Sequence, residues 1–511
     1  MKTMWSCLFS LCVLAAAALP LRANEIDRLV SAKLNAEGRT PAARCSDAVF
    51  VRRIYLDMTG RLPPLWVARQ FTENKRANKR VALINQLFKQ DAFADYWAMK
   101  WCDILRVKAE FPSKLWPNAV QAYQRWLTDA VHDNMPYDQF ARELLTASGS
   151  NFREPAVNFF RAVPDHEPAS LASTVALTFM GQRTDNWPRA RRDGMAAFFA
   201  RLGYKGTAEW KEEVVFFDLP RALKEGMPAG AVFPDGTPQE LLPEVDPRLV
   251  FAEWLVAPDN PYFARAMVNR VWAWLIGRGL VHEADDLRAD NPPSHPPLLD
   301  WLAKELVAHD YDLRHVYRLI LNSDTYQRSC VHSAANADDA RGFSHYLVRR
   351  LEAEVLIDAI NQVAGGSERY TSEIPEPFTF IPPQQRAVAL GDGSITSPFL
   401  DMFGRPPRDT GLESERNNDP SDTQRLHLLN STHIQNKLQR GWALRQLMKR
   451  AKWRPEPIIN QLYLTMLSRP PNAGELKVGM DYMAQEGLKR HEGALDLAWA
   501  LLNSKEFLYR H

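Results

Sequence analysis

The sequence predicts a mainly α, multi-helical and multi-lobed fold with a small extended or β insert near residues 205–247. Apolar residues recur at spacings of three and four along most of the chain, the pattern of amphipathic helices. One stretch, EVVFFD at residues 213–218, is rich in β-formers, and Gly-Pro turns follow it. The composition, 46% hydrophobic and 24% charged in 511 residues, is that of a folded protein. Fifteen tryptophans favour either thick helical cores or carbohydrate-like surfaces.

The first residues have the features of a secretory signal peptide, which we place at residues 1–23. Lys2 precedes a short apolar run, Leu8–Leu19, and the small residue Ala23 ends the segment. The run is too short to span a bilayer comfortably, which disfavours a membrane anchor, and no other long apolar segment follows. We therefore expect a secreted protein of the periplasm or cell envelope, without a transmembrane segment after signal removal.

Removal of this segment leaves a chain without net charge. Cleavage takes away Lys2 and Arg22, which reduces the 63 basic residues to 61, equal to the 61 acidic residues. We expect no nucleic-acid partner, because such proteins carry a basic surface. The remaining Cys45, Cys102 and Cys330 form no CxxC pair. Either one disulfide with one free thiol, or three buried unbridged cysteines, is consistent with them.

The helices are predicted to form two domains, residues 24–204 and 248–511, on either side of the insert. N-terminal helices are expected within residues 25–50, 50–63, 65–71, 81–97, 116–133, 137–147 and 169–180. C-terminal helices are expected at 251–256, 260–277, from 296, from 312, and at 347–363, 424–449, 456–467 and 494–509. Residues 366–425 are predicted to be an irregular loop, and a loop of this length is usually functional or disordered.

Two of these helices carry specific predictions. In the helix at 260–277 the buried stripe is Phe263, Met267, Val271, Trp274 and Leu275, and Arg265, Asn269 and Arg270 are predicted to lie off it. In the helix at 347–363, Arg350 and Glu354 are expected to form an i,i+4 ion pair.

Three octads indicate an internal repeat: IYLDMTGR (54–61), VWAWLIGR (271–278) and LYLTMLSR (462–469). Each ends in a small residue plus Arg, which is typical of a helix C-terminus. Each is followed by a second similar run, LFKQDAF (87–93), ILNSDTY (320–326) or LLNSKEF (501–507), in which Ser323 and Ser504 can cap a short turn. Ordinary helix ends are the alternative, but the paired order favours one helical module used three times.

Several longer blocks also occur in order. They include FVRRIYLDMTGRLP, FMGQR, NPYFARAMVNRVWAWLIGRGLV, RRLEAEVLIDAI, FLDMFGRPPRD and LHLLNSTHIQNKL. Through these blocks the chain resembles a family of planctomycete-type secreted, cytochrome-c-associated proteins with paired domains of unknown function, DUF 1549 followed by DUF 1553. The resemblance covers nearly the whole chain after residue 23. It implies the division into two helical domains but no reaction, since the family has no assigned activity.

The chain departs from this family at two motifs. Family members commonly carry a Cys-x-x-Cys-His-type segment after the FMGQR-like helix, whereas residues 184–189 here read TDNWPR. A Cys-Glu-Cys-Glu-Arg motif corresponds to LESER at residues 412–416. Covalent haem needs those thiols and an axial histidine, so the resemblance implies a haem-free copy, and we expect no cofactor.

Candidate binding residues lie in two loops, and the first is residues 282–295. Its Asp285, Asp286 and Asp290 could bind Ca²⁺, or two of them could do acid–base chemistry, although the loop lacks EF-hand spacing. The alternative is a structured turn in which Asp and Asn bond the local backbone and Arg288 neutralises the acids. His295 closes this loop.

The second candidate set lies within the irregular loop. Arg405 and Arg408 could grip a carboxylate or sulfate in bidentate fashion. Alternatively, they form an ion-pair network with Glu413, Glu415 and Arg416 that pins the loop. No residue is assigned as catalytic or as a metal ligand.

The histidines are interpreted as structural. The chain contains no HExxH, GxSxG or Walker A motif. His309 and His315 lie near helix ends. His427 and His433 lie six residues apart on one predicted helix, which places them on different faces.

The first functional hypothesis is a non-enzymatic binding or scaffold protein of the cell envelope, with an envelope protein or polysaccharide as partner. The alternatives are an extracytoplasmic hydrolase acting on polysaccharide through Asp285 and Asp286 or Glu413 and Glu415, and an electron-transfer partner of cytochrome c-type proteins. Convergence of both acidic loops in one cleft lined by Trp would favour the enzyme, whereas separate and fully ion-paired loops would count against it.

Overall fold

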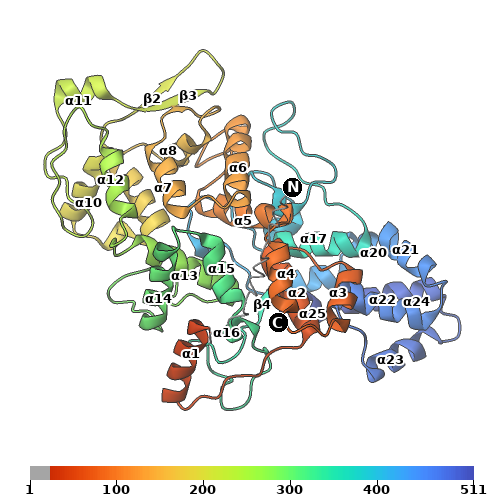
Figure 1. Ribbon diagram of the computed structural model, residues 1–511. Coiled ribbons are helices and arrows are strands. Elements are labelled where there is room, and N and C mark those ends of the chain that lie inside the picture. Colours follow the sequence, from red (N-terminus) through yellow and green to blue (C-terminus); the bar gives the residue numbers. More distant parts are fainter. Residues whose placement is uncertain (1–23) are drawn as a thin grey trace, which may run out of the picture.

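The computed structural model describes residues 24–511, and Figure 1 shows a mainly helical protein with two small sheets. The predicted signal peptide, residues 1–23, lies outside the described residues. The N-terminal helices are α1 (Glu25–Ala36), α2 (Asp47–Thr59), α3 (Leu65–Glu73), α4 (Lys79–Leu87), α5 (Asp91–Ile104), α6 (Pro117–His132), α7 (Tyr137–Thr146), α8 (Asn158–Arg161), α9 (Pro168–Val175) and α10 (Arg189–Ala196). The predicted mainly α fold is confirmed.

The remaining helices cover the middle and the C-terminal part. The middle contains α11 (Leu219–Glu225), α12 (Pro247–Val256), α13 (Phe263–Ile276), α14 (Pro296–Ala308), α15 (Leu313–Leu321) and α16 (Asp324–Gln327). The C-terminal part contains α17 (Ala353–Ala364), α18 (Pro398–Met402), α19 (Asp422–Asn430), α20 (Thr432–Arg440), α21 (Trp442–Arg450), α22 (Pro455–Leu467), α23 (Ala473–Met483), α24 (Arg490–Leu502) and α25 (Lys505–Leu508).

The predicted β insert is an antiparallel hairpin at one edge of the molecule (Figure 1). Strands β2 (Leu202–Gly206) and β3 (Glu213–Phe217) pair with each other, and the short β1 (Gly149–Ser150) pairs with the other side of β3. Helix α11 and an irregular run then lead to α12. Because β1 comes from the N-terminal part of the chain, that part and the insert share one sheet.

All three octads end a helix at a residue with left-handed backbone. Helix α2 ends at Gly60 (φ 58°), α13 at Gly277 (φ 95°) and α22 at Ser468 (φ 60°). A left-handed residue turns the chain out of the helix, and glycine adopts it without a steric penalty. Ser468 takes the same conformation with a side chain in place.

Two of the shorter runs that follow the octads, residues 320–326 and 501–507, each contain a short helix that begins after a serine. The side chain of Ser323 accepts the N–H of Tyr326 and caps α16, and Ser504 does the same for the N–H of Phe507 and caps α25. Both predicted caps are confirmed. Each of these two modules therefore begins with an octad helix and finishes in a short turn capped by serine.

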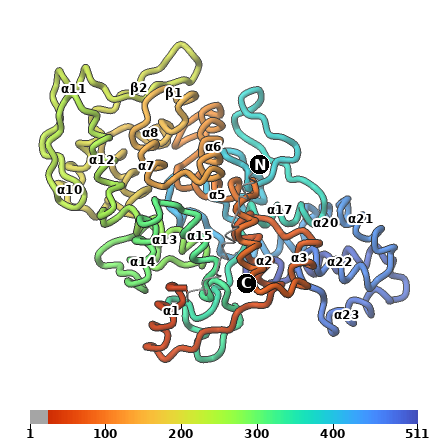
Figure 2. The backbone as a smooth tube through the Cα atoms, in the orientation of Figure 1, coloured from red at the N-terminus to blue at the C-terminus, as the bar shows by residue number. Residues whose placement is uncertain are grey.

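Two buried arginines of α2 tie the first module to the other two. Arg52 donates to the carbonyl oxygens of Met466 (2.6 Å) and Phe507 (2.9 Å) in the third module. Arg53 donates to the carbonyl oxygen of Tyr326 (2.6 Å) in the second. Phe507 and Tyr326 are the last residues of the runs 501–507 and 320–326. The carbonyl groups at these equivalent positions therefore accept hydrogen bonds from two arginines that are adjacent in α2. Figure 2 shows α2 between the green and blue parts of the chain.

A buried ion-pair network accompanies these contacts. Strand β4 (Arg349–Arg350) pairs with β5 (Tyr509–Arg510), which brings Arg510 against α2 and α17. Arg510 lies 2.5 Å from Glu352 and 2.8 Å from Asp57, and Lys100 of α5 lies 2.9 Å from Glu352. Burial raises the pKa of the Glu352 carboxyl, but Arg510 and Lys100 outweigh this effect, and the pKa lies well below its usual range.

Several predicted element boundaries are wrong. The helix expected at 347–363 begins only at Ala353, because residues 349–350 form β4. The expected Arg350–Glu354 pair is therefore wrong, and Arg350 donates to Gln424 instead. The single helix expected at 424–449 is three helices, α19 to α21. Helix α23 has no counterpart among the predicted helices, because few of its side chains are buried and its apolar pattern is weak.

None of the helices in residues 24–511 is long and apolar enough to cross a membrane. Cys45, Cys102 and Cys330 are all unbridged, and the first two are buried. Of the two alternatives for the cysteines, the structure has the one without a disulfide. Burial raises the pKa of the Cys102 thiol to about 11.

Replacing Ser468 with glycine should stabilise the protein. A left-handed residue with a Cβ costs roughly 1 kcal/mol, and the buried Ser468 hydroxyl makes no hydrogen bond within residues 24–511. We expect Ser468→Gly to raise the free energy of unfolding in urea by about 1 kcal/mol. Ser468→Ala removes the hydroxyl but keeps the Cβ, so it should gain less. A glycine variant no more stable than the alanine variant would contradict backbone strain as the cause.

Candidate functional site

The two candidate loops meet in the structure. Residues 282–295 follow α13, and Glu413 opens a short 3₁₀ turn (Glu413–Glu415) within the irregular loop 366–425. The backbone N–H of Glu413 donates to Oδ2 of Asp285 at 2.5 Å. This single contact joins two segments that lie far apart in the sequence into one surface.

The other carboxylate oxygen of Asp285, Oδ1, is held by Arg270. Nε and Nη2 of Arg270 lie 2.9 Å and 2.7 Å from Oδ1 of Asp285, and the guanidinium also donates to the carbonyls of Leu177 and Thr178 just after α9. The two side chains are 0% and 1% exposed. The prediction that Arg270 and Asn269 lie off the buried stripe of α13 is therefore wrong, because neighbouring segments cover this face of the helix as well.

The three arginines of the second loop are committed to acids of the same chain. Arg408 lies 2.9 Å from Asp103, and Arg416 lies 2.7 Å from both Asp103 and Glu354. Arg405 lies 3.4 Å from Glu354. Burial raises the pKa of both carboxyls, but Arg416 in particular outweighs it, and both pKa values lie below their usual range. These contacts correspond to the pinning network rather than to a grip on an external anion.

The other acids of the first loop form a local turn. Arg288 lies 2.7 Å from Asp286 and 3.6 Å from Asp290. Asn291 donates to the backbone carbonyl of Asp286 at 2.9 Å. Within residues 24–511, Asp285, Asp286 and Asp290 are not among the side chains grouped closely enough to hold a metal ion. Their geometry is that of the structured turn.

Glu415 and His295 also stabilise the backbone. Glu415 accepts the N–H of Asp409 at 2.8 Å and so closes a turn of the second loop. The Nδ1 atom of His295 accepts the N–H of Leu298 at 3.3 Å and caps α14. Both residues position the walls of the site instead of facing a ligand.

A polar hollow of about 350 Å³ opens where the loops meet, a size within the usual range of ligand sites. Its lining consists of Ala273, Gly277, Arg278, Gly279, His282, Glu283, Ala284, Glu413, Ser414, Arg416, Asn417, Asn418 and Asp419. None of these lining residues of the described chain is a tryptophan. The acidic loops converge, as the enzyme hypothesis requires, but the cleft lacks the aromatic wall.

Glu413 is the one predicted site residue whose side chain stays uncommitted within the described chain. Its carboxyl faces the hollow and makes no ion pair with another residue of 24–511. Desolvation by the surrounding protein raises the pKa of the Glu413 carboxyl, and nearby Asp285 adds to this against the opposing effect of Lys100. A carboxyl with a raised pKa can donate a proton or a hydrogen bond more readily than an ordinary glutamate.

A larger hollow of about 790 Å³ lies on the other side of the first loop and shares Arg278 with the smaller one. It is lined by Lys33, Glu37, Arg39, Arg278, residues 290–294 and residues 338–342. Arg278 and Arg341 form no ion pair with any residue of 24–511. Burial lowers the pKa of Arg278, and the charge of nearby Arg341 lowers it further. Two neighbouring cations without a carboxylate partner therefore line this hollow.

Sequence reasoning did not find these two arginines. Arg278 closes an octad, where it is explained as a residue that meets the end of its helix. Arg341 lies in a stretch without helical or strand pattern. The only sequence signal for Arg278 is that the acidic loop follows it directly.

The histidine pair of the C-terminal part differs from its prediction. His427 and His433 approach to 3.2 Å between ring nitrogens, and His433 lies 2.9 Å from Glu368. The prediction of different faces is wrong, because Ser431 ends α19 and starts α20 between them.

Comparison with known families matches two regions of the chain. Residues 25–190 match the family model PSCyt2, and residues 247–483 match PSD1, each described as a protein of unknown function (DUF1549 and DUF1553). The chain carries both domains, PSCyt2 followed by PSD1. The predicted family resemblance is confirmed in the same order. No curated protein and no solved structure matches the chain.

The two domains divide the site unequally. Both candidate loops, Arg278 and Glu413 belong to PSD1. PSCyt2 supplies Asp103, which holds the second loop from behind, and Lys33 of α1, which lines the larger hollow. The walls of the hollows are therefore complete only when the two domains are packed together.

Removing the charge of Asp285 should destabilise the protein strongly. Asp285→Asn leaves the buried guanidinium of Arg270 without its carboxylate, and breaking a buried ion pair costs about 3 kcal/mol or more. We expect a loss of this size in the free energy of unfolding measured with urea. Asp290→Asn, at a side chain that is 76% exposed, is the matched control and should change stability by less than about 0.5 kcal/mol. Equal effects of the two variants would contradict a structural role for Asp285.

Proposed function

We propose that the protein is a non-enzymatic binding protein of the cell envelope whose ligand is an anionic, hydroxyl-rich polysaccharide. One observation carries this proposal. Arg278 has no ion-pair partner within residues 24–511 and lines both hollows at once. The location in the envelope rests on the signal peptide expected at residues 1–23.

The charges of the hollows support an anionic ligand. Within residues 24–511 the guanidinium groups of Arg278 and Arg341 have no hydrogen-bond or ion-pair partner, whereas the arginines behind the walls are bound to Asp103 and Glu354. Guanidinium groups recognise carboxylates and sulfates through paired hydrogen bonds. Nearby acids of the larger hollow are held by other groups, since Asp338 pairs with Arg39 and Asp339 accepts backbone N–H groups. A uronate or sulfate group beside Arg278 and Arg341 would give the two guanidinium groups the ion pair that they do not form within residues 24–511.

The remaining lining supports a hydroxyl-rich and extended ligand. Asn417, Asn418, Ser414 and Asp419 offer both hydrogen-bond donors and acceptors in the smaller hollow, which suits a sugar ring. Because Arg278 belongs to both hollows, a ligand that passes this residue can occupy the two together. A polymer of several sugar units has the required length.

Removal of Arg278 should weaken polysaccharide binding. We expect the wild-type protein to bind a soluble uronate polymer or a sulfated polysaccharide, but not neutral dextran, in isothermal titration calorimetry. Arg278→Ala should lower the affinity at least tenfold, since a hydrogen-bonded charged contact contributes about 1.5–3 kcal/mol. Arg440→Ala, at an exposed arginine of α20 outside both hollows, should bind as the wild type does. Equal binding by the two variants would contradict the proposal.

One observation favours a second candidate, carboxylate-dependent hydrolysis of the same polymer. Glu413 has a raised pKa and faces the smaller hollow, as a general acid would. Hydrolysis also needs a second carboxylate. Asp285 is committed to Arg270, and Glu283 lies 2.5 Å from Arg183. Those two acids already have cationic partners. Asp419, the remaining acid of this hollow, is exposed, and no ion pair or hydrogen bond within residues 24–511 holds its carboxylate opposite Glu413. Binding is therefore the better supported of the two functions.

Glu413→Gln separates the two candidates. It keeps the shape and hydrogen-bonding capacity of the side chain but cannot ionise. We expect the variant to bind the polymer within threefold of the wild type, and neither protein to release new reducing ends from it. If the wild type releases reducing ends and the Glu413→Gln variant does not, the function is hydrolysis instead of binding alone.

A further inference from the structure

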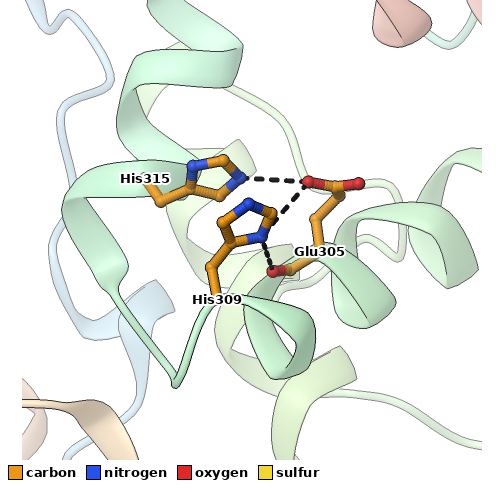
Figure 3. A group of neighbouring side chains, drawn as sticks. All are labelled: Glu305, His309 and His315. Carbon is orange, nitrogen blue, oxygen red and sulfur yellow. Dashed lines mark hydrogen bonds and ion pairs between the residues drawn. The ribbon is translucent and has the colours of Figure 1, made fainter.

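Three metal-ligating side chains meet at the end of α14 that lies away from the hollows (Figure 3). Glu305 is on the last turn of α14, His309 directly follows that helix, and His315 is in the first turn of α15. Helix α14 has 13 residues and is therefore about 20 Å long. This length separates the group from Ser294 and the larger hollow at the other end.

The donor atoms of the three side chains are close together. Nε2 of His315 lies 3.0 Å from Oε2 of Glu305, and Nδ1 of His309 lies 3.5 Å from the same oxygen. One ligand atom from each residue lies within 4.8 Å of the other two. Ligands of a tetrahedral Zn²⁺ ion with bonds of 2.0–2.1 Å are about 3.3 Å apart. Small side-chain rotations would bring all three into bonding distance of one ion.

The turn that carries these residues is held firmly. Asp312 accepts the N–H of His315 at 3.1 Å and caps α15. The hydroxyl of Tyr311 donates to the carbonyl of Val256 at 2.7 Å, and its N–H donates to the carbonyl of Leu306 at 2.9 Å. A turn fixed from both sides keeps its ligands in place before an ion arrives, which favours metal binding.

The two imidazole rings lie against each other and against one carboxylate. His309 and His315 stack with ring centroids 3.6 Å apart, and both approach one carboxylate oxygen (Figure 3). Two protonated rings at this distance would repel each other, whereas two neutral imidazoles and one carboxylate form an accepted zinc ligand set. Binding of an ion through Nδ1 of His309 requires that atom to give up its contact with the backbone carbonyl of Glu305, which is 3.0 Å away.

We propose that Glu305, His309 and His315 bind one Zn²⁺ ion with a fourth position open to solvent. The side chain of His309 is 47% exposed, which leaves room for water or a further ligand on the ion. Three protein ligands with one open position is the coordination of zinc ions that activate water or accept an external group. The site replaces the structural interpretation that the sequence alone gives to His309 and His315, and it is independent of the polysaccharide function.

Zinc titration of tag-free, chelator-treated protein tests this site. We expect isothermal titration calorimetry with ZnCl₂ to show one ion bound per chain, and Zn²⁺ to raise the melting temperature, because an ion that binds only the folded state stabilises it. Co²⁺ in place of Zn²⁺ should give the intense visible absorption of a tetrahedral ion. His315→Ala and His309→Ala should each weaken Zn²⁺ binding roughly a hundredfold or more, since even orienting partners contribute up to about that factor.

His491→Ala is the matched control, because His491 is 49% exposed, lies on α24 and belongs to no such group within residues 24–511. It should bind Zn²⁺ as the wild type does, and circular dichroism should show that all variants keep their helices. Absence of saturable Zn²⁺ binding by the wild type would overturn the proposal. Equal affinity of the His315→Ala and His491→Ala variants would overturn it as well, and would leave the group as an ordinary histidine–glutamate contact.

Discussion

Buried ion pairs between arginines and carboxylates hold the PSCyt2 and PSD1 domains together. Asp103 of α5 binds Arg408 and Arg416 of the PSD1 loop. Asp57 of α2 likewise binds Arg510, which follows the residues that match PSD1. A buried charge that loses its partner costs several kcal/mol. Each domain supplies only one side of the Asp103 pairs, so these charges stay buried and paired only while the two domains are packed together.

The candidate site depends on this network. Arg416 fixes the end of the 3₁₀ turn that presents Glu413, and the Glu413 N–H in turn meets Asp285. Asp285 is itself fixed by Arg270 within α13. Each wall of the smaller hollow is therefore anchored to a charge that cannot move without a large energetic cost. Such anchoring makes a pre-formed pocket, which loses little entropy when a ligand binds.

Sequence patterns predicted the features that depend on neighbouring residues. The left-handed ends at Gly60 and Gly277 and the cap at Ser323 each follow from local backbone chemistry, and each is present. The burial of Arg270 and the meeting of Asp285 with Glu413 were not predictable in this way. Their partners lie on other elements, and no local pattern distinguishes an arginine that reaches a buried acid from one that reaches water. For the same reason the candidate loops could be named but their contact could not.

Most of the buried arginines near the site are paired with carboxylates of the same chain, so the few arginines without such a partner are informative. Arg405 and Arg408, which first suggested an anion site, are each paired with one acid and also donate to backbone carbonyls of the same loop. Their donors are used inside the protein, so these two arginines are explained by stability. Arg278 and Arg341 have the same chemistry but form no ion pair with another residue of 24–511, and they border hollows instead of packed interior. Charges left unpaired at a concave surface gain a partner only from outside the protein. Their position, rather than any motif, is the argument for a ligand.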